Sequence, residues 1–205
     1  MPLQNRVTPL GELIATPARG LVFGNRGRLH DDQRRIRRPY AGKRWIACRL
    51  EFRGRHRDAM PPGRYTGLFF LDEATAFAAG HRPCAECRHE DYEHFAALCG
   101  ARADAIDARL HTERRGPRQE RAVDALPDGA LVLHDGEPWL VLGSELLRWT
   151  TGGYAERLDR PGGSMTVITP PLLLDVLRAG WASSVPVFHP SAVKRGGSGG
   201  TRRVC

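Results

Sequence analysis

The chain has 205 residues, of which 41% are hydrophobic and 26% charged, and its formal net charge at pH 7 is +8. This length allows one domain or two small ones, and the apolar content lies above that of disordered chains. Five unevenly spaced cysteines argue against a disulfide framework. The N-terminus has no apolar signal segment and no stretch is long enough to span a membrane, so we expect a cytoplasmic protein.

The positive charge is concentrated near the N-terminus. Residues 1–60 contain 14 Lys and Arg against 5 Asp and Glu, whereas residues 61–205 contain 17 against 18. All of the early cations except Lys43 are arginines, which pair with phosphate through two parallel hydrogen bonds. The asymmetry favours a nucleic-acid partner over a merely solubilising surface.

Residues 1–43 predict a basic arm of loops, with short strands at 10–14 and 21–23. Apolar and polar residues alternate over 44–52, which predicts a strand with Cys48 on its apolar side. A basic turn at 53–57 leads to a second strand at 65–71. Asp72 is a suitable cap for a short helix that ends at Gly80, and a second helix is expected from 89 to 98.

Residues 100–125 predict a linker with a helix at 102–110. Beyond residue 126 the pattern is that of a β-meander. It begins with a hairpin at 130–134 and 139–142 and continues with strands at 146–150 and 165–168. A C-terminal helix follows from Pro171 to Gly180. We therefore expect an α+β fold, with a module at 44–99, a β-rich part at 126–192 and a flexible basic tail at 193–205.

Cys84 and Cys87 form a Cys-x-x-Cys pair, in which a tight turn lets both sulfurs face one ion. Without any sign of secretion, such a pair indicates metal or redox chemistry rather than a structural disulfide. A redox pair usually stands at a helix N-terminus after a βαβ-type strand, whereas a helix and a glycine precede this one. The sequence therefore favours zinc.

The residues around this pair resemble a known family. Phe69-Phe70, an Ala-rich helix, Ala79-Gly80-His81-Arg82-Pro83-Cys84, two residues and Cys87 follow one another in the order and spacing of the second half of a zinc domain. That domain is the metal-binding domain of the Ada-type adaptive-response DNA-repair proteins, and the resemblance covers only residues from about 65 to 90. It implies a strand–helix–loop–helix module that is stabilised by structural zinc, contacts the DNA backbone and uses Cys84 and Cys87 as two of four ligands.

The chain departs from the family at the first ligand pair, a Cys-x-x-x-Cys upstream of the two phenylalanines. Cys48 and His56 are the nearest candidates and complete the predicted set of Cys84, Cys87, Cys48 and His56, with His30 in reserve. The family's phosphotriester acceptor belongs to the missing pair, so methyl transfer is not implied. His81 stands at an aromatic position of the motif, which predicts packing rather than metal ligation.

Arginines flank these candidate ligands and are the predicted phosphate contacts, namely Arg53, Arg55, Arg57, Arg82 and Arg88. Trp139, Trp149 and Tyr154 are candidates for stacking on bases, although aromatic residues of a small meander more often form core. The predicted function is zinc-dependent binding of nucleic acid, DNA rather than RNA, in a repair context. Two alternatives stay open: a metal-dependent nuclease or other enzyme acting on nucleic acid, and a zinc-stabilised protein-interaction module.

Overall fold

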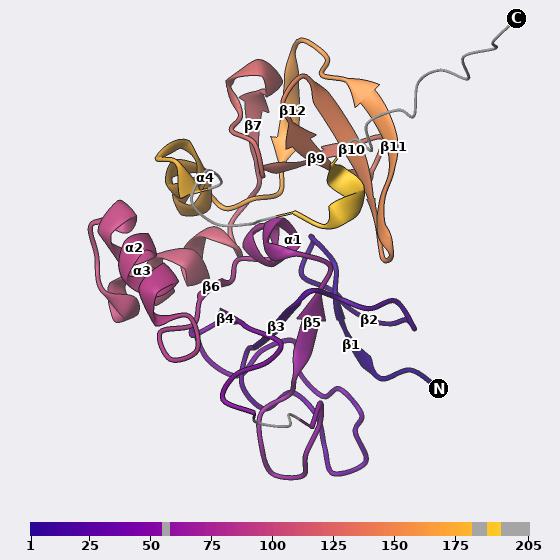
Figure 1. Cartoon of the computed structure of the whole chain (residues 1–205), viewed down its shortest axis with the longest axis vertical. Helices are drawn as coiled ribbons and strands as arrows, with labels where there is room; N and C mark the ends of the chain where they lie inside the picture. The colour runs from indigo at the N-terminus through magenta and orange to yellow at the C-terminus, as the bar shows by residue number, and fades with distance from the viewer. Residues whose placement is uncertain (55–57, 182–187, 194–205) are drawn as a thin grey trace, which may run out of the picture.

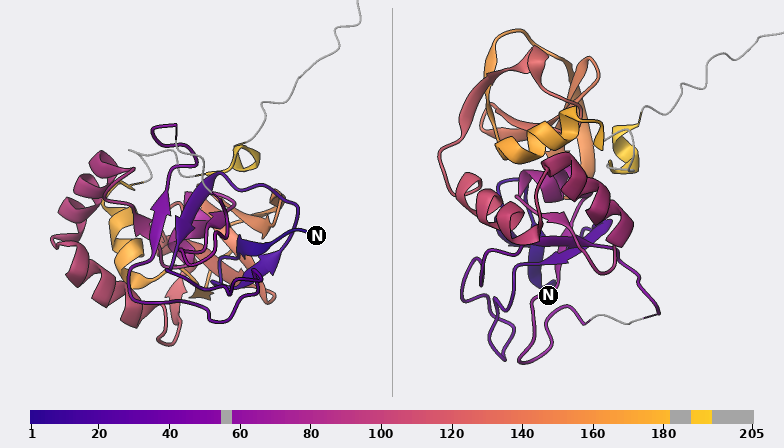
Figure 2. Two further views of the ribbon diagram at one scale, coloured as in Figure 1. Left: turned by 90° about the horizontal axis from the view of Figure 1, so that it is seen from below. Right: turned by 90° about the vertical axis from the view of Figure 1, so that its left-hand side faces the viewer.

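A computed structural model describes residues 1–54, 58–181 and 188–193, which form two six-stranded sheets and four α-helices. The N-terminal sheet and the C-terminal sheet lie at opposite ends of the molecule, with helices between them and along one side (Figures 1 and 2). The predicted α+β class is confirmed. No helix in the described part of the chain has the length and apolar character to cross a membrane.

The N-terminal sheet has the strand order β2-β1-β5-β3-β4-β6. Its strands are β1 (Gln4–Val7), β2 (Leu13–Ala15), β3 (Val22–Asn25), β4 (Ile46–Cys48), β5 (Leu68–Phe70) and β6 (Arg82–Pro83). The strand predicted over 44–52 keeps only three residues, which are those that pair with β3, and its outer neighbour β6 pairs with just two of them. Alternation alone could not reveal how short the partner strand is.

The first helix has the predicted cap and glycine stop. Helix α1 (Glu73–Ala78) begins after Asp72, whose carboxylate accepts a hydrogen bond from Thr75 N at 2.9 Å, and it is followed by Gly80 at φ +77°. Helices α2 (His89–Cys99) and α3 (Ala103–Glu113) come next, and α4 (Pro171–Arg178) follows the last strand. Helix α3 extends beyond the predicted end at 110.

The C-terminal sheet has the order β11-β10-β9-β8-β12-β7 and contains the expected meander from β8 to β11. Its strands are β7 (Gln119–Ala122), β8 (Leu131–His134), β9 (Glu137–Leu142), β10 (Glu145–Thr150), β11 (Gly153–Asp159) and β12 (Ser164–Val167). Strands β7 and β11 were not predicted. All four residues of β7 are exposed, and most of β11 is too, so neither carries a clear apolar alternation.

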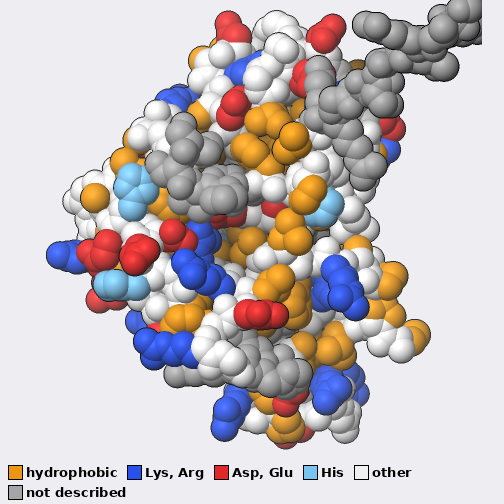
Figure 3. Space-filling view, viewed as in Figure 1, with side chains coloured by type: hydrophobic (Ala, Val, Ile, Leu, Met, Phe, Trp, Pro, Cys, Tyr) orange, Lys and Arg blue, Asp and Glu red, His pale blue; other side chains and the backbone are white. Residues whose placement is uncertain are grey.

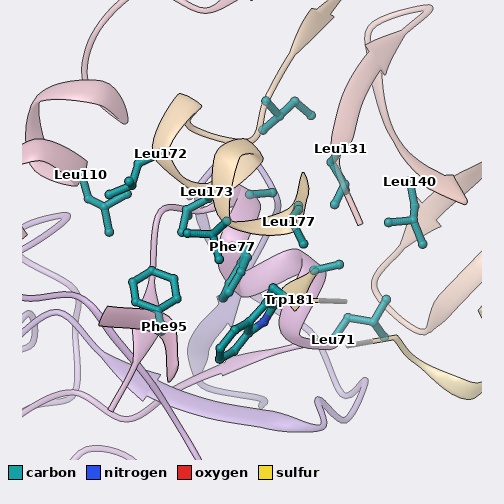
Figure 4. Close-up of a cluster of buried hydrophobic side chains, with 14 of the residues drawn as sticks. Leu71, Phe77, Phe95, Leu110, Leu131, Leu140, Leu172, Leu173, Leu177 and Trp181 are labelled. Carbon is teal, nitrogen blue, oxygen red and sulfur yellow. The ribbon is translucent and has the colours of Figure 1, made fainter. Parts of the chain in front are cut away.

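One hydrophobic cluster joins the helices to the C-terminal sheet (Figure 4). Phe77 of α1 stacks on Trp181 with ring centroids 5.8 Å apart, and Phe95 of α2 meets the same indole edge-on at 5.6 Å. Leu131 and Leu140 of the sheet belong to this cluster, together with the buried leucines of α4. The core is therefore continuous across residue 125.

A buried hydrogen-bond network crosses the same boundary. Asp72 is 2% exposed, and its carboxylate accepts from the Tyr154 hydroxyl at 2.8 Å and from His189 N at 2.9 Å, besides Thr75. Burial raises the pKa of Asp72. Trp149 Nε1 donates to the Thr75 hydroxyl at 3.0 Å, and Trp139 is buried. The three aromatic residues considered for base stacking are thus engaged within the protein.

Candidate metal centre

Three buried cysteines converge at one end of the N-terminal sheet. The Sγ atoms of Cys48, Cys84 and Cys87 all lie within 4.8 Å of one another. Strands β4 and β6 run parallel with Ala47 opposite Pro83, and Cys84 N donates to Ala47 O at 2.9 Å. The next residues along these two strands are Cys48 and Cys84, which places their side chains next to each other.

The loop between β6 and α2 brings in the third sulfur. Cys84 Sγ accepts a hydrogen bond from Glu86 N at 3.4 Å, and Arg88 N donates to Cys84 O at 3.1 Å. This turn folds Cys87 back towards Cys84 before α2 begins. Backbone N–H groups aimed at a cysteine sulfur stabilise the thiolate form, which is the form that binds metal.

An apolar shell surrounds the three sulfurs. Phe23, Ile46, Phe52 and Phe69 pack against the cysteines, and the rings of Phe23 and Phe69 meet edge to face at 5.4 Å. The cysteines are only 4–7% exposed. In so small and dry a space three negative charges repel one another strongly unless a cation lies between them.

The ionisation of the thiols reflects this crowding. Hydrogen bonds from the other two thiols and from the loop backbone lower the pKa of Cys84. Hydrogen bonds with Cys84 and Cys87 raise the pKa of Cys48, with burial adding to the effect. Cys84 is thus the thiol of the cluster that ionises most readily, and a bound cation would stabilise the thiolate form of all three.

The arrangement suits a soft metal ion. Two sulfurs each about 2.3 Å from a tetrahedral zinc lie about 3.8 Å apart, which is compatible with three sulfurs that all lie within 4.8 Å of one another. Three protein ligands among the described residues leave one coordination position to be filled. Thiolate ligands favour Zn²⁺, Cu⁺ or iron–sulfur chemistry over hard cations.

Of the predicted ligands, His56 lies outside the described residues, as do Arg55 and Arg57. The reserve ligand His30 does not join the cluster: its ring is hydrogen-bonded to the Thr66 hydroxyl at 2.6 Å and to Pro61 O at 3.2 Å. His81 is fully buried and its ring meets Phe70 edge-on at 4.5 Å, which agrees with packing.

Two of the predicted phosphate contacts are engaged inside the protein. Arg82 is 2% exposed, and its Nε and Nη2 donate to the two carboxylate oxygens of Asp107, each at 2.8 Å. Arg88 is buried between Glu73 at 2.6 Å and Asp91 at 2.7 Å. Neither guanidinium faces solvent, so the structure gives them a structural position rather than one beside a phosphate.

The exposed positive charge lies elsewhere in the N-terminal half. Arg53 is exposed, with its guanidinium 4.9 Å from the ring centroid of Phe52 beside the cysteine cluster. Further exposed arginines pair with no acid among the described residues, namely Arg34, Arg38, Arg49 and Arg64. In Figure 3 most Lys and Arg side chains of the visible face lie over the lower half, which holds the N-terminal sheet.

Comparisons with protein-family models, with curated proteins and with solved structures found no match to this chain. The resemblance to the Ada-type metal-binding domain therefore depends on the residue pattern around Cys84 and Cys87 alone.

Proposed function

We propose that this chain is a zinc-binding protein in which Cys48, Cys84 and Cys87 are ligands of a structural zinc ion. The observation that carries the proposal is the convergence of three buried Sγ atoms within 4.8 Å, from two strands and a loop, inside an apolar shell. Buried thiols are common, but three at metal-ligand spacing are what a thiolate site requires. The resemblance of residues 65–90 to an Ada-type zinc domain points to the same ion.

His56 is the proposed fourth ligand. The support is sequence proximity, because Phe52, four residues before His56, packs on the cysteine cluster. A Cys₃His set closes the tetrahedron with protein groups, as structural zinc sites do.

The test is the metal content of the full chain, purified without added metal, measured by elemental analysis. We expect about one zinc per chain in the wild type and loss of metal in Cys48→Ser and in Cys84→Ser. Cys99→Ser is the matched control, because Cys99 lies on α2 and packs against the hydrophobic core instead. Metal-free wild-type protein prepared under reducing conditions would contradict the proposal.

We further propose that the protein binds nucleic acid, DNA rather than RNA, mainly through the phosphate backbone. The support is the charge asymmetry of the sequence and the exposed, unpaired arginines of the N-terminal half, among them Arg49 and Arg53. Arg53 lies beside the cysteine cluster, where a bound zinc would hold the neighbouring chain in place.

Binding to a short DNA duplex at several salt concentrations tests this part. We expect the double variant Arg49→Ala/Arg53→Ala to bind more weakly and to reduce the salt dependence by about one unit per lost phosphate contact. The control is Arg102→Ala/Arg178→Ala, which removes the same charge from exposed positions just before α3 and at the end of α4. Equal effects of the two double variants, or salt-independent binding, would count against backbone recognition.

One alternative is an enzyme acting on nucleic acid, because the described residues supply three ligands to the cluster. If water rather than His56 occupies the fourth position, the zinc is open to substrate. Cobalt substitution with visible spectroscopy separates the two cases. His56→Ala would shift the spectrum of a Cys₃His site, whereas an unchanged spectrum would favour the open, catalytic site.

A further inference from the structure

A cavity of about 510 Å³ lies where the N-terminal loops, the end of α3 and strand β12 meet, and its volume is that of a small-ligand site. Its charged lining residues are Arg26, Arg114, Arg115 and Arg118 against the single acid Glu113. That carboxylate is already engaged, since it accepts from Arg109 Nε at 2.7 Å and from Leu172 N at 2.8 Å. The lining therefore has a clear excess of positive charge.

Arg26 is buried without an acidic partner. It is 1% exposed, its Nη1 donates to Gly11 O at 2.9 Å and its Nε donates to His81 Nε2 at 3.2 Å. Its Nη2 is buried and donates to no acceptor among the described residues. Arg82, which is equally buried, has the carboxylate of Asp107 on two of its nitrogens. A buried guanidinium without a carboxylate is costly unless an anion from outside compensates it.

Arg114, on the same side of the cavity, also has a buried guanidinium nitrogen without an acceptor among the described residues. Its Nη1 and Nη2 donate to Gly80 O at 3.0 Å and Lys43 O at 2.7 Å, while its buried Nε has no described acceptor. The Cζ atoms of Arg26 and Arg114 lie 4.1 and 3.7 Å from the ring centroid of Trp45. The indole therefore fixes two like charges at one side of the cavity.

Of the other titratable groups near these arginines, the Asp107 carboxylate acts on Arg114, and the two histidines carry no negative charge. Burial and the two arginines lower the pKa of His81 well below its usual value, and burial lowers that of His111 as well. Asp107 is paired with Arg82 and lies 4.0 Å from Arg44 Nε. Burial together with the charge of Arg114 lowers the pKa of Arg26 to about 9.

We propose that this cavity is a binding site for the phosphoryl group of a phosphate monoester. A doubly charged phosphoryl group matches several unneutralised guanidinium groups better than a single carboxylate does. The buried Arg26 and the half-buried Arg114 form one wall, and the exposed Arg115 and Arg118 lie in the same lining, where solvent reaches them. The site is separate from the cysteine cluster and does not depend on its metal.

The test is calorimetric titration of the full, metal-loaded chain with inorganic phosphate and with adenosine monophosphate. We expect saturable binding that weakens about tenfold or more in Arg115→Ala/Arg118→Ala. Both residues are exposed, so this variant keeps the fold. Arg102→Ala/Arg178→Ala, which removes the same charge far along the chain, is expected to bind as the wild type does. No saturable binding of either probe, or equal weakening in both double variants, would overturn the proposal.

The same phosphoryl chemistry occurs in a free phosphate ester and at the 5′ end of a DNA strand. A five-nucleotide strand with and without a 5′-phosphate separates them. Binding of the phosphorylated strand at least tenfold tighter than that of the mononucleotide would support a strand end, and comparable binding a free ester. If the phosphate made no difference to the strand and the mononucleotide did not bind, the phosphoryl site would be refuted, whatever the metal content.

Discussion

Among single residues, Cys48 is the one whose place in the candidate site depends most on the fold. It stands 36 positions before Cys84 in the chain, and no ligand spacing links the two. The parallel pairing of Ala47 with Pro83 is what brings the two thiols together. The candidate site is therefore built by a strand pairing of only two residues.

Thiol reactivity tests the state of these residues. After removal of metal with a chelator, we expect iodoacetamide at pH 8 to modify Cys84 faster than Cys48, because the cluster lowers the pKa of Cys84 and raises that of Cys48. Burial raises the pKa of Cys99 to about 11, so only about 0.1% of it is thiolate at that pH and it serves as the slow internal reference. Peptide mass spectrometry gives the rates. Modification of Cys84 at the same rate before and after chelation would show that no metal protects it.

At the scale of elements, the approach of β3 to β4 depends on Gly24. A Cβ atom at this position would lie 2.2 Å from Ile46 O and 2.9 Å from Phe70 Cε2. Gly24 pairs with Ala47, the residue before Cys48, so any displacement of β4 moves a proposed ligand. Close strand packing and the metal centre are thus linked.

Gly24→Ala is therefore expected to destabilise the fold by about 2 kcal/mol or more and to weaken metal retention. Urea unfolding and elemental analysis measure the two effects. Gly152→Ala is the control, since nothing lies within 4 Å of its added Cβ and it is expected to change stability by less than about 0.5 kcal/mol. Equal stability of the two variants would contradict the packing described for β3 and β4.

The elements also show which parts of the fold the sequence could predict. The Asp72 cap, the glycine after α1 and the hairpin at Asp135-Gly136 are local signals, and each produced the predicted element. Strands β7 and β11 gave no such signal, because polar side chains occupy most of their positions. The sequence could not predict the buried ion pairs of Arg82 and Arg88 either. Asp107, the partner of Arg82, lies 25 residues away, and only tertiary packing reveals it.

For the whole molecule, the Asp72 network ties the N-terminal half to the C-terminal strands. Tyr154→Phe removes one donor from a buried carboxylate and is expected to cost about 2 kcal/mol, within a range of roughly 1–3 kcal/mol. Chemical unfolding followed by both fluorescence and circular dichroism is the measurement. Because the core is continuous across residue 125, we expect the two probes to report a single transition.

The exposed Tyr65 provides the control for this substitution, because Tyr65→Phe removes a hydroxyl group that lies at the surface. That variant is expected to stay within about 0.5 kcal/mol of the wild type. Two separate transitions in the wild type, or similar losses in the two tyrosine variants, would show that the halves are not coupled through Asp72.

The central claim is that Cys48, Cys84 and Cys87 bind one zinc ion, and X-ray absorption at the zinc edge tests it most directly. We predict three sulfur neighbours at about 2.3 Å and one lighter neighbour at about 2.0–2.1 Å in the wild type. Cys48→Ser should lose one of these sulfurs or the metal altogether. A zinc ion surrounded only by nitrogen and oxygen, or a protein without zinc, would contradict the account.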